Sequence, residues 1–239
     1  RRTEDVFLAE GVKMFLEAPR EQLQEVYVSE SFLEKCSCRE HLEEVGYEVV
    51  SDSVFSKISD TCTPQGVLCV LKQFHYNIEE MLRDKAPLFL LLENIQDPGN
   101  LGTMLRTGEG AGVSGIIMSR DTVDLYNPKV IRSTMGSIYR VPFYYADDFA
   151  AAVHQVQQAG VSVYAAHLRG KNSYACQDYT KGTAFLIGNE GNGLREETAE
   201  LADCYIRIPM EGKVESLNAA VASSILMYEA HRQRATIEK

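Results

Sequence analysis

The sequence of 239 residues has none of the segments that mark membrane, secreted or zinc-binding proteins. No apolar run approaches the ~20 residues that span a bilayer, and residues 1–5 lack the apolar core of a signal peptide. The six cysteines are scattered, and the one close pair, Cys36 and Cys38, has no second pair at zinc spacing. We therefore expect a cytoplasmic protein with reduced thiols, no membrane segment and no metal.

Several common catalytic motifs are also missing from the sequence. There is no Gly-x-Gly-x-x-Gly after a strand, no Gly-Lys-Ser/Thr phosphate loop and no Gly-x-Ser-x-Gly elbow. These absences argue against a dinucleotide-binding enzyme, a phosphate-loop enzyme and an α/β-hydrolase. His154, His167 and His231 are not paired at ligand spacing, and we interpret them as surface residues.

Basic residues are in deficit, because 24 Lys and Arg stand against 34 Asp and Glu, for a net charge of −10. A protein that binds nucleic acid through its overall charge shows the opposite balance. Any nucleic-acid role must therefore use a local patch. The densest basic stretch contains Arg106, Arg120, Lys129, Arg132 and Arg140, although acidic residues interrupt it and a solvated surface explains it equally well.

What the sequence does contain is an ordinary globular composition, 45% hydrophobic and 24% charged. Residues 1–72 alternate short strand-like and helix-like segments, which predicts a small α/β domain. Residues 73–86 form a linker in which Asn77 caps a short helix ahead of Pro87. Residues 87–239 form the second and larger domain.

Five apolar runs in the second domain are typical of buried strands: 88–92, 115–118, 161–166, 184–187 and 205–208. The first is apolar at every position, as expected of a strand buried on both faces. Helix-like segments separate the runs, among them 101–110, 148–159, 194–202 and 218–233. This alternation predicts a parallel, doubly wound α/β sheet.

Three polar loops, 93–100, 188–193 and 209–218, each follow one of these runs. Loops in these positions gather at one edge of an open α/β sheet, and the glycines of 188–193 let the backbone approach a ligand closely. Ser216 or Asn218 can simply cap the last helix, but the loops hold more amide and carboxylate groups than capping needs. The surplus favours a polar ligand, and Arg106 is the one plausible cationic catalytic group next to the loops, although for Arg106 alone a salt-bridge or surface interpretation would be preferred.

Taken together, the three loops resemble the three motifs of the SpoU (TrmH-type) family of SPOUT RNA 2′-O-ribose methyltransferases. The first motif corresponds to residues 94–102 with Arg106 and Thr107. The second corresponds to 187–194, and the third to 208–210 with 216–222. Residues 6–72 further resemble the small substrate-binding domain that precedes the catalytic domain in many members.

The resemblance implies a small N-terminal α/β domain and a C-terminal parallel-sheet α/β domain tied in a deep trefoil knot, an exception to the usual absence of knots. It implies a homodimer formed through the knotted domain, acting on RNA. It also implies that S-adenosylmethionine is held largely by backbone groups in the knot. By motif match the cofactor residues are Gly188, Ile208 and Leu217, with Ile187, Asn189 and Met210 beside them.

The implied reaction transfers a methyl group to a ribose 2′-hydroxyl, with 23S ribosomal RNA as the expected substrate and no metal. Arg106 matches the arginine to which the family assigns activation of the hydroxyl. Because the pKa of arginine lies above ~12, orienting the hydroxyl and clamping a phosphate suit it better than acting as a base. The positions that match the other polar site residues are Asn100, Glu190, Ser216 and Asn218.

Two alternatives stay open at this point: transfer RNA as the substrate, and a catalytically silent RNA-binding or ribosome-assembly protein of the same fold. The presence of Arg106, Glu190, Ser216 and Asn218 disfavours the silent protein, because binding alone does not need them. An α/β enzyme acting on a small nucleotide is disfavoured by the N-terminal domain, which a small substrate does not require.

Overall fold

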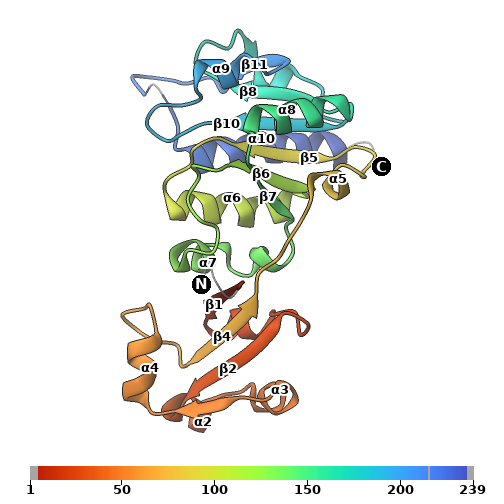
Figure 1. The fold of residues 1–239 in the computed structure, drawn as a ribbon. Coiled ribbons are helices and arrows are strands. Elements are labelled where there is room, and N and C mark those ends of the chain that lie inside the picture. The colour runs from red at the N-terminus through yellow and green to blue at the C-terminus, as the bar shows by residue number, and fades with distance from the viewer. Residues whose placement is uncertain (1–4, 215, 236–239) are drawn as a thin grey trace.

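The chain builds two β-sheets, one from its N-terminal third and one from the remainder (Figure 1). The computed structural model describes residues 5–214 and 216–235. The smaller sheet, red to orange in Figure 1, lies at one end of the molecule, and an extended segment after its last strand leads to the larger sheet. No helix among the described residues is long and apolar enough to cross a bilayer.

The N-terminal sheet has four strands in the order β1-β4-β2-β3. Its strands are β1 (Val6–Glu10), β2 (Leu23–Ser29), β3 (Glu48–Val50) and β4 (Val67–Lys72). β4 pairs antiparallel with β1 and β2, whereas β2 and β3 are parallel. The helices are α1 (Val12–Leu16), α2 (Glu30–Lys35), α3 (Arg39–Val45) and α4 (Asp52–Ile58). Ser29 and Ser51 begin α2 and α4 by accepting a backbone hydrogen bond, as N-cap residues do.

The larger sheet is parallel throughout and has seven strands in the order β7-β6-β5-β10-β8-β11-β9. The five strands expected from apolar runs are present as β5 (Leu88–Leu92), β6 (Gly115–Ser119), β8 (Ser162–Ala166), β10 (Thr183–Ile187) and β11 (Cys204–Arg207). β7 (Phe143–Ala146) and β9 (Asn172–Ser173) were not expected. The parallel α/β architecture is confirmed, and the knot stays a prediction.

Helices cover both faces of this sheet, and β5 shows why. All five of its side chains are fully buried, so the expectation of burial on both faces is confirmed. Leu88, Leu90 and Leu92 join the cluster that contains residues of α6 and α10, while Phe89 and Leu91 join the cluster of α8. The helices are α5 (Ile78–Met81), α6 (Pro98–Ala111), α7 (Pro128–Thr134), α8 (Phe149–Gln158), α9 (Glu196–Ala199) and α10 (Ala219–Ala235).

The helix expected at 194–202 is shorter than predicted, because α9 spans only Glu196–Ala199. The late start of α9 is explained by the buried carboxylate of Glu93, which directly follows β5. It accepts a 2.8 Å hydrogen bond from the backbone N–H of Arg195 and another from the hydroxyl of Thr198. Arg195 is thereby held in an extended conformation, and the helix cannot begin before residue 196.

The two sheets share one hydrophobic core. Phe7 of β1 packs against Tyr126, with ring centroids 4.8 Å apart, and Tyr126 packs in turn against Phe143 of β7. Phe74, within the expected linker, donates its backbone N–H to the Tyr126 hydroxyl at 2.7 Å. The buried Tyr139 hydroxyl donates to the carbonyl of Met14 in α1. The segment after β4 therefore packs as part of the fold and holds the N-terminal sheet against the larger one.

Candidate functional site

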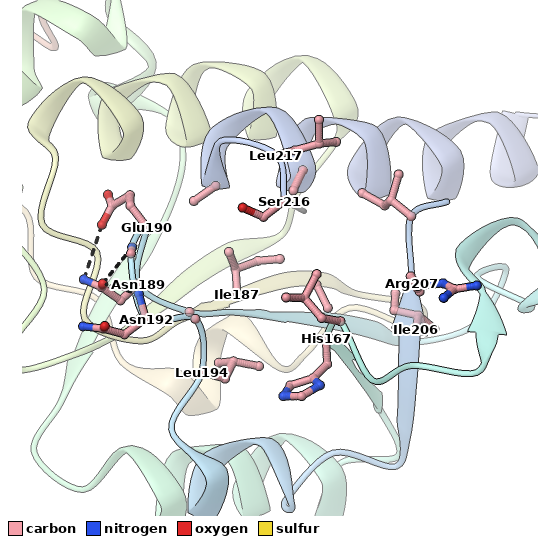
Figure 2. A pocket seen from close by; sticks show the side chains of 18 of the residues that line it. His167, Ile187, Asn189, Glu190, Asn192, Leu194, Ile206, Arg207, Ser216 and Leu217 are labelled. Carbon is pink, nitrogen blue, oxygen red and sulfur yellow. Dashed lines mark hydrogen bonds between the residues drawn. The ribbon is translucent and has the colours of Figure 1, made fainter. Parts of the chain in front are cut away.

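A cavity of about 260 Å³ opens at the carboxyl ends of β8, β10 and β11. In Figure 2 the side chains from the three strand ends and from the start of α10 surround a common space. Ligands of open α/β sheets bind outside this edge of the sheet. The cavity is therefore the candidate ligand site of the larger domain.

The loop after β10 is a tight turn that closes on itself. Asn189 and Gly193 exchange backbone hydrogen bonds of 3.0 and 2.9 Å, and the Asn189 side-chain oxygen accepts from the backbone N–H groups of Gly191 and Asn192. A Cβ on Gly188 would lie 2.2 Å from the backbone of Gly193 and Leu194. The glycine at 188 is thus required by the packing of the loop itself, besides the ligand approach that we expected to explain it.

All six residues expected to hold the cofactor line this cavity, although they come from three separate segments of the chain: Ile187, Gly188, Asn189, Ile208, Met210 and Leu217. Of the residues expected to be catalytic, Glu190 and Ser216 line it too. Asn100, Asn218 and Arg106 are not part of its wall. Two of these three are nevertheless connected to the wall by hydrogen bonds.

A chain of side-chain hydrogen bonds joins the three motif loops. The Asn218 side-chain amide donates to the side-chain oxygen of Asn100 at 2.9 Å, and the side-chain amide of Asn100 donates to the Glu190 carboxylate at 3.0 Å. Glu190 also accepts the backbone N–H groups of Gln96 at 3.2 Å and Asp97 at 3.0 Å. Asn218 caps α10 as well, accepting from the backbone of residues 220 and 221. Its capping role and its role in the site are therefore compatible.

The charge of Glu190 is stabilised where it lies. Burial alone would raise the pKa of this carboxyl, but the hydrogen bonds from Asn100 and from the backbone of Asp97 and Gln96 outweigh burial and hold the pKa below its usual value. Glu190 is therefore an ionised acceptor at neutral pH. Its charge binds the loop after β5 to the loop after β10.

Arg106 lies on α6, which Asp97 begins by accepting the backbone N–H of Asn100 at 2.7 Å. The side chain is exposed, and no carboxylate within residues 5–214 and 216–235 forms an ion pair with it. A guanidinium without a protein partner keeps its donors available for a phosphate or a hydroxyl. The interpretation of Arg106 as a surface residue is confirmed by its exposure. The interpretation that it forms a salt bridge is wrong for the described residues.

The sequence interpretation missed the loop after β8, which supplies Ala166, His167 and Leu168 to the cavity wall. The expectation that His167 is a surface residue is wrong, since it is partly buried and packs against the Tyr205 ring at 5.0 Å. Burial lowers its pKa, and the nearby Arg169 lowers the pKa further. The sequence did contain a signal for this position: His167 directly follows the buried run 161–166, so it lies at the same sheet edge as the other loops. His154 and His231 are exposed, as expected.

No group of three or more His, Cys, Asp or Glu side chains placed to hold a metal ion occurs in the described part of the chain. All six cysteines are free, and Cys38 and Cys69 are buried.

Comparison with known families gives two matches that together span most of the chain. Residues 87–228 match the SpoU rRNA Methylase family, and residues 1–69 match the MRM3-like substrate binding domain. Each match falls on one of the two sheets.

Individual relatives agree with these matches. The chain is 35% identical over 180 residues to the 23S rRNA (guanosine(2553)-2′-O)-methyltransferase RlmP of Bacillus subtilis, covering 75% of this chain and 70% of the relative. It is 32% identical over 222 residues to the 23S rRNA (guanosine-2′-O-)-methyltransferase RlmB of Bordetella pertussis, covering 90% and 91%.

A solved structure supports the same assignment. The SpoU methyltransferase AviRb from Streptomyces viridochromogenes, in complex with the cofactor AdoMet, superposes with a TM-score of 0.89. The identity is 27%, and the match covers 99% of this chain and 93% of that one. The resemblance inferred from the three motif loops is confirmed, and the chain belongs to the SpoU rRNA Methylase family.

Proposed function

We propose that this protein transfers a methyl group from S-adenosylmethionine to a ribose 2′-hydroxyl of RNA, with 23S ribosomal RNA as its substrate. The observation that carries the proposal is the cavity, whose wall contains residues of the second and third motif loops. Glu190, in the second loop, accepts hydrogen bonds from Asp97 and Asn100 of the first. The names of the relatives RlmP and RlmB support ribosomal RNA as the substrate.

The cavity is on the size scale of a site for a small-molecule cofactor. Its volume of about 260 Å³ is close to the lower end of small-molecule pockets, ~300 Å³. Ile187, Ile208, Met210 and Leu217 supply apolar walls, and the backbone at Gly188 is free of a side chain. These residues and Asn189 would hold S-adenosylmethionine, which supplies an electrophilic methyl group when bound.

S-adenosylmethionine would supply the methyl group: a bond would form between the methyl carbon and the ribose 2′-oxygen, the sulfur–carbon bond would break to leave S-adenosylhomocysteine, and the hydroxyl proton would pass to water. Arg106 has no ion-pair partner among the described residues, so its donors can bind an RNA phosphate and orient the hydroxyl. Ser216, which is exposed and lines the cavity, would contact the ribose. Asn100, Glu190 and Asn218 position the loops by their mutual hydrogen bonds. Alignment of the reacting atoms would supply most of the rate.

Three further parts of the proposal concern assembly and location. The chain forms a homodimer through α10, whose Val221 and Tyr228 leave 48% and 49% of their surface exposed although they are large and apolar. Residues 1–72 form the RNA-binding domain, 73–86 the connection and 87–239 the catalytic domain, as the matched ranges 1–69 and 87–228 support. A cytoplasmic location stays a prediction.

The experiment is calorimetric titration with S-adenosylmethionine, followed by transfer of its radiolabelled methyl group to 23S ribosomal RNA. Arg106→Ala should reduce methyl transfer at least ~100-fold, on the scale of losing one charge-stabilising group, while cofactor affinity stays within about twofold. Transfer to a tRNA instead would favour that alternative substrate. Cofactor binding without methylation of either RNA would overturn the proposed reaction.

A further inference from the structure

The five basic residues of the stretch 106–140 fall into two groups in the structure, those with an ion-pair partner and those without one among the described residues. Arg120 is paired with Asp147, and Arg140 is paired with both Glu17 and Glu109. In contrast, no described carboxylate forms an ion pair with Arg106, Lys129 or Arg132. The paired arginines hold the fold together, whereas the other three cations keep their charge for another partner.

The three unpaired cations lie on two helices in direct contact. A Cβ on Gly102 of α6 would be 2.3 Å from the Cβ of Ser133 on α7, so the glycine lets the helices touch. Arg106 lies one turn after Gly102, and Lys129 lies one turn before Ser133. Residues four apart share a helix face, so Arg106 and Lys129 each lie on the face of their helix that carries this contact.

Arg132 extends this surface toward the N-terminal domain. α7 lies between α6 and the small sheet, as Figure 1 shows, and contacts β1. Arg132 lines a narrow notch there together with Leu8, Glu10 and Asp60 of the N-terminal domain. The Glu10 carboxylate accepts hydrogen bonds from Ser59, Thr61 and the backbone of Gln65, so it is committed to its own loop. The basic surface formed by Arg106, Lys129 and Arg132 therefore ends at this notch, where Glu10 and Asp60 face Arg132.

We propose that Lys129 and Arg132 of α7 bind phosphates of the RNA that flank the nucleotide held by Arg106. The inference rests on the proposed function and deepens it by naming a substrate-binding surface. A protein with a net charge of −10 cannot attract RNA through its overall field, so affinity must come from cations without protein partners. α7 supplies two such cations beside the catalytic helix, on the side that faces the N-terminal domain. RNA bound there would contact both domains.

The test measures how RNA binding depends on salt, because each phosphate contact on a single strand adds about 0.7 to the slope of log affinity against log salt. Wild type and the double variant Lys129→Gln/Arg132→Gln would be titrated with fluorescent fragments that tile 23S ribosomal RNA. The slope should fall by about 1.4, which at 0.1 M salt corresponds to ~25-fold weaker binding. Lys129→Gln alone, at an exposed position, should lower the slope by about 0.7 and the affinity about 5-fold.

A matched control is Arg83→Gln/Lys181→Gln, which removes one exposed arginine and one exposed lysine near the amino ends of β5 and β10, away from the site. This control should keep the wild-type slope, and all variants should keep the wild-type affinity for S-adenosylmethionine. If the double variant matches the control in slope while wild type methylates RNA, the phosphate-binding surface is wrong and the proposed function stands. If wild type binds the cofactor but none of the fragments, both the surface and the RNA substrate are overturned.

Discussion

Glu190→Gln should loosen the connection between the loop after β5 and the loop after β10. The native carboxylate accepts four hydrogen bonds, from the side chains of Asn100 and Asn189 and from the backbone of Gln96 and Asp97. Glutamine has nearly the same shape but one oxygen fewer, so its amide group must face one of these N–H donors. The substitution therefore leaves at least one donor without an acceptor and removes the charge from the remaining bonds.

The cost can be estimated from these contacts. An unsatisfied donor costs about 1–3 kcal/mol, and the site is only partly buried, so we expect about 2 kcal/mol of lost stability. For a protein of this size each kcal/mol lowers the melting temperature by about 2–4 °C, which predicts a fall of about 4–8 °C at pH 7. Circular dichroism melts would measure it, with the exposed Glu197→Gln as the control for loss of charge alone.

The same reasoning predicts the pH dependence. Hydrogen bonds hold the pKa of Glu190 below its unfolded value, so its contribution is complete above the unfolded pKa of ~4.3 and is lost as pH falls through the folded pKa. The difference in melting temperature between wild type and Glu190→Gln should accordingly shrink below about pH 4.3. A melting temperature equal to that of Glu197→Gln at pH 7 would refute the assignment of Glu190 as the joint between the loops.

Two other predictions follow from the packing of the larger domain. Gly188→Ala should destabilise the protein by about 1–3 kcal/mol and weaken cofactor binding, because its Cβ would overlap the backbone of Gly193. In the control Gly191→Ala the new Cβ would lie 3.6 Å from the Asn189 side chain, an ordinary contact distance. Equal melting temperatures for the two variants would contradict this account of the loop. Sedimentation of the full chain should show a species of twice 26.7 kDa, and Tyr228→Arg on the exposed face of α10 should shift it to the monomer. A wild-type monomer at all concentrations would exclude the dimer.

The interface between the two domains decides how such experiments are designed. Phe7, Phe74, Tyr126 and Phe143 form one aromatic cluster across the boundary. Removing the N-terminal domain would uncover Tyr126 and Phe143 on the larger domain. RNA binding is therefore best compared between point variants of the full chain.

Much of the architecture follows from local features of the sequence. A run such as Leu88–Leu92, apolar at every position, can be buried only between two layers, so the five central strands were predictable. The three loops were recognisable because glycines and amide side chains stood directly after such runs. β7 was missed because Tyr144 and Tyr145 are only partly buried at the edge of the sheet, so its pattern is weak. β9 has two residues, too few for any pattern.

The sequence by itself determined the family, the parallel sheet and the identity of the loops at its edge, because these depend on short segments whose composition can be read locally. Only the tertiary structure decided which side chains meet. The contacts from Asn218 to Asn100 and from Asn100 to Glu190 join residues about a hundred positions apart. The entry of His167 into the cavity and the separation of paired from unpaired arginines likewise depend on how distant segments pack. No local pattern encodes those distances, since they arise when the sheet brings its strand ends together.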